Sequence, residues 1–223
     1  MVFLDNGVYT LAEVSQLTHV HPARVRSWFI QRADGAGHGQ VFEADYQPVG
    51  RDRAVSFHDL IDVLVAAQFR DRHNVPMRVV RRAHGILQEE LGTKHPFCHS
   101  DLYTDGRRIF QNVARLGEDR LSDVISRQQF FLHIREKLDH IDYSQATRLA
   151  CRWKIARGVV LDPSVNMGRP SIADTGIATF VIASQYYANA ENASLVADLY
   201  GISETDVLNA VRFEGLYGHR RVA

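Results

Sequence analysis

The sequence predicts a mainly α-helical protein with small β-hairpins, an α+β fold, and three observations support this prediction. Apolar residues recur at helical spacing in several separate segments. Glycine-rich or Asp-Gly turns with alternating flanks lie between some of these segments. The apolar framework of the first pair of short helices recurs 182 residues later. With 223 residues, the chain is long enough for about two compact units.

The composition is that of an ordinary globular protein, with 45% hydrophobic and 23% charged residues. Because 26 Lys plus Arg balance 26 Asp plus Glu, nucleic-acid binding would require a local basic patch. The longest apolar stretch, around residues 60–67, is far shorter than the roughly 18 residues of a membrane span. The first residues lack a secretory pattern and only Cys98 and Cys151 occur. We therefore expect a reduced, cytoplasmic protein with no membrane partner.

Two short helices joined by a turn at residues 18–20 are expected near the N-terminus. Thr10 followed by Glu13 is a capping box for the first helix, and His21 followed by Pro22 suits the start of the second. The apolar residues at helical spacing are Leu11, Val14, Leu17, Val25, Trp28 and Phe29. This pattern predicts a helix-turn-helix.

A glycine-rich hairpin, or wing, is expected over residues 31–55. It contains the glycine cluster at residues 35–39 and alternates around Val41 and Phe42. Two amphipathic helices follow, one beginning at Ser56 and one ending at Gly92, with a break at residues 74–76. The first 92 residues are therefore predicted to form a winged helix-turn-helix domain.

A hairpin-rich linker module is expected over residues 93–157. The Asp-Gly pair at 105–106 favours a hairpin, residues 130–138 suit a helix, and residues 148–153 and 158–161 look extended. The remaining domain, residues 158–223, is predicted to be helical and contains the repeat. Adding 182 pairs Val14 with Val196, Leu17 with Leu199, Val20 with Ile202, Val25 with Val207 and Phe29 with Val211.

The second helix of the N-terminal pair and the wing carry the side chains expected to bind DNA. Arginine can donate a forked pair of hydrogen bonds to guanine and can neutralise phosphate. The candidate residues are His21, Arg24, Arg26, Ser27, Gln31, Arg32, Arg51 and Arg53. A second basic cluster, suited to gripping the flanking backbone, is formed by Arg70, Arg72, Arg78, Arg81 and Arg82. Each arginine alone is more typical of a solvated face, but together they predict DNA binding.

The C-terminal helix pair has the opposite charge, which favours contact with protein over phosphate. Its acidic residues are Glu191, Asp198, Glu204, Asp206 and Glu214. The unit then forms a dimer seam or binds a partner, and a small structural domain is the alternative. The tail beyond Gly218 suits insertion into an acidic pocket, with a frayed terminus as the alternative. The candidate partner-binding residues are Arg212, His219, Arg220 and Arg221.

No enzyme, cofactor or metal site is expected from the sequence. The glycine cluster at residues 35–39 follows a helix, so it lacks the strand-to-helix geometry of a dinucleotide loop. His95, Cys98 and His99 are close together, but a structural zinc site needs four ligands and no matching pair follows. No nucleophile motif accompanies the scattered acid-base candidates His133, Asp139, His140 and Asp142.

Two regions of the chain resemble known families. The N-terminal region resembles a MerR-type winged helix-turn-helix, with His21 where that family usually has Ser or Thr; the matching segments are residues 9–14, 25–28 and 56–91. The C-terminal region resembles a small homeodomain-like domain often encoded beside PIN-type ribonuclease toxins, and it departs from that family at residues 173–176. The matching segments there are residues 160–179, 196–203 and 207–214.

The combination resembles the long VapB-type antitoxins of bacterial type II toxin-antitoxin modules. The resemblance implies a homodimer whose N-terminal domain binds the operator DNA of its own operon, while another region inhibits a PIN-domain (VapC-type) toxin. PIN ribonucleases use carboxylate-bound magnesium, so Arg220 or Arg221 entering that site would block catalysis. The alternative is a stand-alone MerR-like dimeric transcription regulator whose other segments dimerise or sense an effector.

Overall fold

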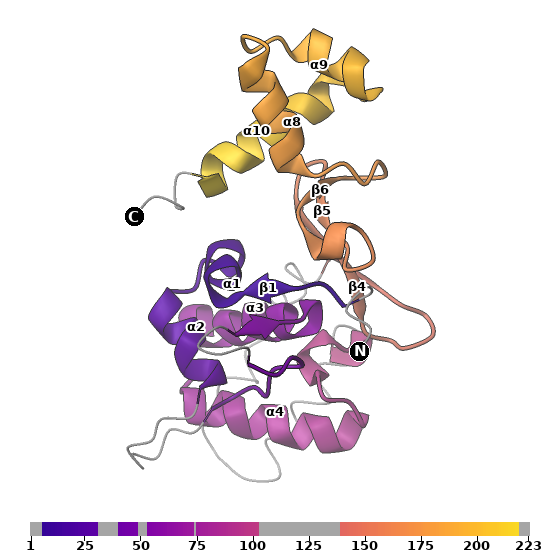
Figure 1. The fold of residues 1–223 in the computed structure, drawn as a ribbon. Coiled ribbons are helices and arrows are strands. Elements are labelled where there is room, and N and C mark those ends of the chain that lie inside the picture. Colours follow the sequence, from indigo (N-terminus) through magenta and orange to yellow (C-terminus); the bar gives the residue numbers. More distant parts are fainter. Residues whose placement is uncertain (1–5, 31–39, 49–52, 74, 103–138, 219–223) are drawn as a thin grey trace. The chain divides into compact units, whose positions relative to one another are not determined.

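The computed structural model describes residues 6–30, 40–48, 53–73, 75–102 and 139–218 (Figure 1). It is a mixed α+β protein with helices and two small sheets, as the sequence predicts. The chain forms two compact units. The N-terminal unit is Tyr9–Ala150, and the C-terminal unit is Cys151–Ala223 together with Met1–Val8. The sequence had instead predicted three domains, with boundaries at residues 92 and 157.

The N-terminal unit is built around a helix that is buried on most of its sides. Its elements are β1 (Tyr9–Thr10), α1 (Leu11–Thr18), α2 (Pro22–Phe29), β2 (Ala54–Val55), α3 (Phe57–His73), α4 (Met77–Leu91), the 3-10 turn η1 (Pro96–Cys98) and β3 (Ile141–Tyr143). Helix α3 packs against α1, α4 and η1, and Figure 1 shows it between α1 and α4. Leu60, Ile61, Val63 and Leu64 are all buried, which is typical of a helix at the centre of a core.

The two short helices at the start of this unit begin as the sequence predicts. The Thr10 hydroxyl accepts a hydrogen bond from the Glu13 backbone N–H at 3.2 Å, and the Glu13 carboxylate accepts one from the Thr10 N–H at 2.8 Å. His19 ends α1 in the left-handed conformation, with φ 58°. His21 Nδ1 then accepts the Ala23 N–H at 3.3 Å and caps α2. Local side-chain caps therefore set both helix starts.

The segment expected to form the wing differs from the prediction over the residues that are described. Strand β2 pairs antiparallel with β1, with Tyr9 opposite Val55. Residues 40–48 contain no strand, and the glycine cluster lies outside the described residues. The reason is that the Phe42 N–H donates to the Trp28 carbonyl at 3.0 Å. This bond holds the segment on the end of α2, with the Phe42 ring buried, rather than beside a partner strand.

Residues expected in the linker module complete the core of the N-terminal unit. Phe97 is fully buried, and its ring centroid lies 5.1 Å from that of His84, 5.5 Å from Phe69 and 6.5 Å from Phe42. Aromatic pairs at these separations contribute to packing beyond their buried area. The boundary expected at residue 92 therefore cuts through a packed core. The expected Asp-Gly hairpin and the helix over residues 130–138 lie outside the described residues.

The C-terminal unit combines a small antiparallel sheet with three helices. Its elements are β4 (Ala150–Ala156), β5 (Val159–Leu161), η2 (Asn166–Gly168), β6 (Ser171–Ile172), α8 (Thr179–Ala188), α9 (Ala193–Tyr200) and α10 (Glu204–Gly218). Strands β4, β5 and β6 pair antiparallel in this order, which confirms the two segments expected to be extended. The helices enclose a core that includes Ile172, Ile182, Val196 and Val207. Among the described helices, none has the length and apolar character needed to cross a membrane.

The predicted repeat of the helix pair extends to the helix caps. The Asn192 side chain accepts the Leu195 N–H at 3.0 Å, and Asn192 stands 182 residues after the cap residue Thr10. Gly201 ends α9 in the left-handed conformation, with φ 64°, at the position that corresponds to His19. The two helix pairs therefore share both their start and their turn.

Burial departs from the repeat most strongly at Leu199. Val196 and Val207 are fully buried, as their counterparts are. Leu199 is 61% exposed, whereas Leu17, its counterpart, is only 7% exposed. The C-terminal pair thus presents apolar surface where the N-terminal pair buries it.

We expect Gly158→Ala to destabilise the C-terminal unit. Gly158 has φ +71°, and a Cβ there would lie 2.8 Å from Nδ2 of Asn209, a buried side chain. A left-handed alanine costs about 1–2 kcal/mol, and the contact with Asn209 adds to this. Calorimetric melting should show a lower Tm. Gly215→Ala is the matched control, because this helical position has open space and should melt no earlier; an equal loss in both variants would contradict the argument.

Candidate nucleic-acid interface

A hollow in the N-terminal unit gathers side chains from α2, the end of α3, the start of α4 and the segment before β2. The lining residues are Arg24, Ser27, Trp28, Val41, Arg70, Pro76, Met77, Arg78 and Arg81. Four of the nine are arginines. Three arginines of the predicted second basic cluster, Arg70, Arg78 and Arg81, therefore line the same hollow as Arg24 of the predicted DNA-recognition helix, whereas Arg82 does not line it and the side chain of Arg72 lies outside the description.

The turn between α3 and α4 brings these arginines together. The Val75 N–H donates to the Phe69 carbonyl at 3.1 Å, which ends α3, and the Pro76 carbonyl accepts from the N–H groups of Val79 and Val80 in the first turn of α4. The chain thus reverses within a few residues. Arg70, on the last turns of α3, and Arg78, on the first turn of α4, lie at one edge of the unit, and both are exposed.

The segment before β2 closes the other side of the hollow. The Val41 N–H donates to the Trp28 carbonyl at 2.7 Å, so Val41 lies against the end of α2. Arg81 Nε donates to the Gln40 carbonyl at 3.3 Å. These bonds connect α2, this segment and α4 into one surface.

The electrostatics of the hollow favour an anionic ligand. Among the described residues, its lining contains four guanidinium groups and no carboxylate. Arg24 pairs with the neighbouring Asp71 at 2.6 Å, with the two side chains 41% and 48% exposed. Such exposed pairs contribute little free energy, so a phosphate oxygen can replace the Asp71 carboxylate. Arginine is also the cation best suited to forked hydrogen bonds with phosphate.

The structure brings only some of the predicted DNA-binding residues to the hollow. Arg24 and Ser27 line it, and the Ser27 hydroxyl donates to the Arg24 carbonyl at 2.7 Å. Arg26 and His21 are exposed on α2 and at its cap, and neither lines the hollow. Arg53 Nη1 donates to the Phe29 carbonyl at 3.3 Å, so it binds the C-terminal end of α2. The other candidates, which lie outside the described residues, are Gln31, Arg32 and Arg51.

The candidate partner-binding residues belong to the C-terminal unit. Arg212 is exposed on α10, while His219, Arg220 and Arg221 lie outside the described residues. Sequence reasoning missed the apolar character of this unit's surface. Its exposed large side chains on α8, α9 and α10 are Phe180, Tyr187, Leu195, Leu199, Leu208 and Leu216. Helical spacing gave no sign of it, because leucines at a predicted core stripe are expected to be buried.

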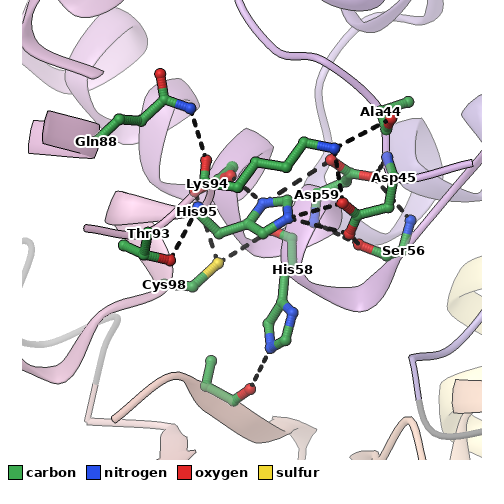
Figure 2. Close-up of polar contacts among 12 residues, drawn as sticks. Ala44, Asp45, Ser56, His58, Asp59, Gln88, Thr93, Lys94, His95 and Cys98 are labelled. Carbon is green, nitrogen blue, oxygen red and sulfur yellow. Dashed lines mark hydrogen bonds and ion pairs between the residues drawn. The ribbon is translucent and has the colours of Figure 1, made fainter. Parts of the chain in front are cut away.

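A second polar site lies inside the N-terminal unit, where the start of α3 meets the residues before η1 (Figure 2). His95 is buried between two carboxylates. Its Nδ1 lies 2.8 Å from Asp62 Oδ2, and its Nε2 lies 3.1 Å from Asp45 Oδ1. Lys94 Nζ adds a bond of 2.8 Å to the same Asp45 oxygen. Side chains far apart in the sequence therefore share one network.

The protonation of this network follows from burial and from its hydrogen bonds. Burial lowers the pKa of His95, but hydrogen bonds to Asp45 and Asp62 overcome it and raise that pKa to about 10. Burial raises the pKa of Asp59 to about 6, against the backbone hydrogen bonds that it accepts. Burial lowers the pKa of His58, as does the positive charge of His95. The cluster thus contains both a protonated and a neutral imidazole at pH 7.

Known proteins similar to this chain include one relative in sequence and one solved structure. No family model matches the chain. The chain is 23% identical over 232 residues to the uncharacterized protein Rv2308 of Mycobacterium tuberculosis, covering 96% of this chain and 92% of that protein. It is also similar to the crystal structure of Rv2018 from the same organism, with a TM-score of 0.71 and 26% identity. That match covers 91% of this chain and 96% of the solved one. The likeness therefore extends across both units.

Proposed function

We propose that this protein is the antitoxin of a type II toxin-antitoxin module, which binds operator DNA with its N-terminal unit and a PIN-domain ribonuclease toxin with its C-terminal unit. The observation that carries the DNA-binding half of the proposal is the hollow in which Arg24 of α2 meets Arg70, Arg78 and Arg81. Sequence-independent affinity for DNA comes from such neutralisation of phosphates.

In this proposal α1 and α2 act as a winged helix-turn-helix of the MerR type, and α2 lies in the major groove. Arg26 and Ser27 then face base edges, while the hollow at the side of α2 binds the flanking phosphates. The protein acts as a homodimer, because two copies related by a twofold axis match paired half-sites in an operator.

The C-terminal helices, in a homeodomain-like arrangement, supply the toxin-binding surface. Exposed leucines and acidic side chains there suit a protein partner better than phosphate. Arg212 and the tail arginines Arg220 and Arg221 are the groups available to pair with the carboxylates of a PIN active site.

Two assays on the full chain test the proposal. The first is co-expression with the product of the adjacent gene, followed by pull-down and a ribonuclease assay. The second is a gel shift with DNA from upstream of the chain's own gene. A complex with suppressed cleavage, together with a specific shift, is the expected result. A specific shift without any complex favours the alternative, a stand-alone MerR-like regulator, and the absence of both a shift and a complex overturns both functions.

We expect Asp71→Asn to raise DNA affinity about two- to fivefold, because its carboxylate competes with phosphate for Arg24. Fluorescence anisotropy at low salt measures the change. Asp174→Asn is the matched control, since this exposed carboxylate belongs to the C-terminal unit. Weaker binding by Asp71→Asn would mean that the Arg24–Asp71 pair positions the arginine for DNA rather than competing for it.

A further inference from the structure

We propose that the N-terminal unit contains a zinc site formed by Asp45, His58 and His95. Each of the three offers one ligand atom, and these atoms lie within 4.8 Å of one another. Asp45 comes from the segment before β2, His58 from the first turn of α3, and His95 from the residue before η1. The sequence expectation of no metal site weighed His95 only with its neighbours Cys98 and His99.

His95 is oriented as a zinc-binding imidazole is. Its Nδ1 donates to Asp62 Oδ2 at 2.8 Å, and Asp62 is itself buried. The outer carboxylate fixes the tautomer that leaves Nε2 as the ligand, an arrangement typical of zinc-binding histidines. Nε2 lies 3.0–3.1 Å from the two Asp45 carboxylate oxygens. The proton on Nε2 therefore lies between His95 and Asp45, where a metal ion would bind both residues.

His58 is oriented in the same manner by a different partner. Its Nε2 lies 3.0 Å from the Ala150 carbonyl, the bond drawn from the outer end of the His58 ring in Figure 2. A carbonyl only accepts hydrogen bonds, so His58 has its proton on Nε2 and its lone pair on Nδ1. The ring centroids of His58 and His95 are 5.4 Å apart. Once an ion displaces the proton from Nε2 of His95, Nδ1 of His58 and Nε2 of His95 are two neutral ligand nitrogens for it.

The net negative charge of the cluster also favours binding of a divalent cation. Asp45, Asp59 and Asp62 contribute three negative charges around the site, and Lys94 contributes one positive charge. A divalent ion balances the remaining two negative charges. Asp59 Oδ1 has no hydrogen-bond partner among the described residues and lies 3.9 Å from Nδ1 of His95, so this carboxylate adds negative charge beside the site without being one of its ligands. An unpaired buried carboxylate oxygen is costly.

The donor set selects zinc over the alkaline-earth ions. Two imidazoles and one carboxylate suit zinc, whereas magnesium and calcium prefer oxygen ligands only. Ligand atoms of a tetrahedral zinc ion are about 3.4 Å apart, so separations of up to 4.8 Å have to shorten by up to about 1.4 Å. The separations that have to shorten are those to His58, because Nε2 of His95 already lies 3.0–3.1 Å from Asp45, which is on a partly exposed loop and accepts from Ser56 Oγ at 2.6 Å. Water can complete the fourth position from that side.

Cys98 is close to the cluster but is assigned a different role. Its Sγ donates to the His58 carbonyl at 3.0 Å and lies 3.6 Å from Asp62 Oδ1. It thus binds the backbone of the first turn of α3 and is not among the three grouped ligand atoms. A zinc ion at this site should have nitrogen and oxygen ligands alone.

The test is zinc titration of the full chain after removal of metal by a chelator. Isothermal calorimetry should give one zinc ion per chain at about micromolar affinity or tighter, with no heat from magnesium. Zinc should also raise the Tm. Cobalt, used as a spectroscopic probe, should give the intense visible bands of a tetrahedral ion without a sulfur charge-transfer band.

Matched variants assign the ligands. Asp45→Asn and His58→Gln should each weaken zinc binding at least about tenfold, while circular dichroism stays that of the folded protein. His99→Gln, a neighbouring buried histidine outside the group, and Cys98→Ala should keep the affinity. Asp45 is partly exposed, so its variant is informative even if His58→Gln fails to fold.

Three results would overturn the proposal. One is a folded wild-type chain that binds no zinc at micromolar concentration. Another is unchanged affinity in folded Asp45→Asn. The third is loss of zinc binding in Cys98→Ala together with a sulfur charge-transfer band in the cobalt spectrum of the wild type, which would mean that Cys98 is a ligand. None of these outcomes depends on DNA or toxin binding.

Discussion

Combined replacement of Arg24, Arg70 and Arg78 by alanine is expected to weaken operator binding by about 100-fold or more at low salt. Each of these guanidinium groups lines the hollow beside α2, and each hydrogen bond to a charged group contributes about 1.5–3 kcal/mol. If all three neutralise phosphates, the slope of log affinity against log salt should fall by about three. Anisotropy titrations at several salt concentrations measure both quantities.

The fold should survive this triple replacement. Arg70 and Arg78 are exposed, and Arg24 pairs only with the half-exposed Asp71 among the contacts described for it. Arg212→Ala is the matched control, because it removes an exposed arginine from α10 of the other unit. A triple variant with unchanged affinity and unchanged salt slope would remove the hollow from the DNA-binding surface and would shift attention to Arg26.

Features set by neighbouring residues were predictable from the sequence. The capping box of Thr10 and Glu13 needs only a spacing of three, and the structure forms it. The 182-residue repeat also held at the caps, because Asn192 accepts the Leu195 N–H as Thr10 accepts that of Glu13. Such interactions close within one helical turn, so tertiary packing has little opportunity to override them.

Long-range pairings were beyond the same reasoning. The strand at residues 54–55 was expected inside a hairpin, yet it pairs with Tyr9 and Thr10. Turn-spacing rules predict that a strand pairs with its nearest neighbour in the sequence. In the structure, the segment that would be this neighbour is held on α2, with Phe42 buried against Trp28, so its backbone is not available to pair with residues 54–55. Tertiary packing thus replaced a local turn with a non-local contact.

Both candidate sites depend on such non-local contacts. The turn at Val75 brings Arg70 and Arg78 together, and both line one hollow with Arg24, which belongs to the other predicted cluster. His95 meets Asp45, 50 residues earlier, only because the segment before β2 and η1 both pack on α3. A motif search restricted to close spacing tests His95 only against Cys98 and His99. It therefore misses Asp45 and His58, which are the residues grouped with His95 in the structure.

Replacement of Leu208 and Leu216 by glutamate is expected to weaken toxin binding by about 100-fold or more. The two leucines are 43% and 69% exposed on α10, and Arg212 lies midway between them. Positions four apart share one helix face, so the three form a single outward stripe. Burying a leucine contributes about 1.5–3 kcal/mol, and an introduced carboxylate adds a desolvation cost.

The same variant separates a toxin surface from a dimer seam. Size-exclusion chromatography of the chain alone should give the wild-type oligomeric state, and its Tm should be unchanged because both leucines are exposed. Tyr187→Glu on α8 is the matched control for an exposed apolar side chain outside the stripe. If the double variant becomes monomeric where the wild type is a dimer, the stripe joins two copies of this chain instead. If toxin binding persists at full strength in a folded dimer, the contact belongs to the tail, and deletion after Gly218 should then abolish it.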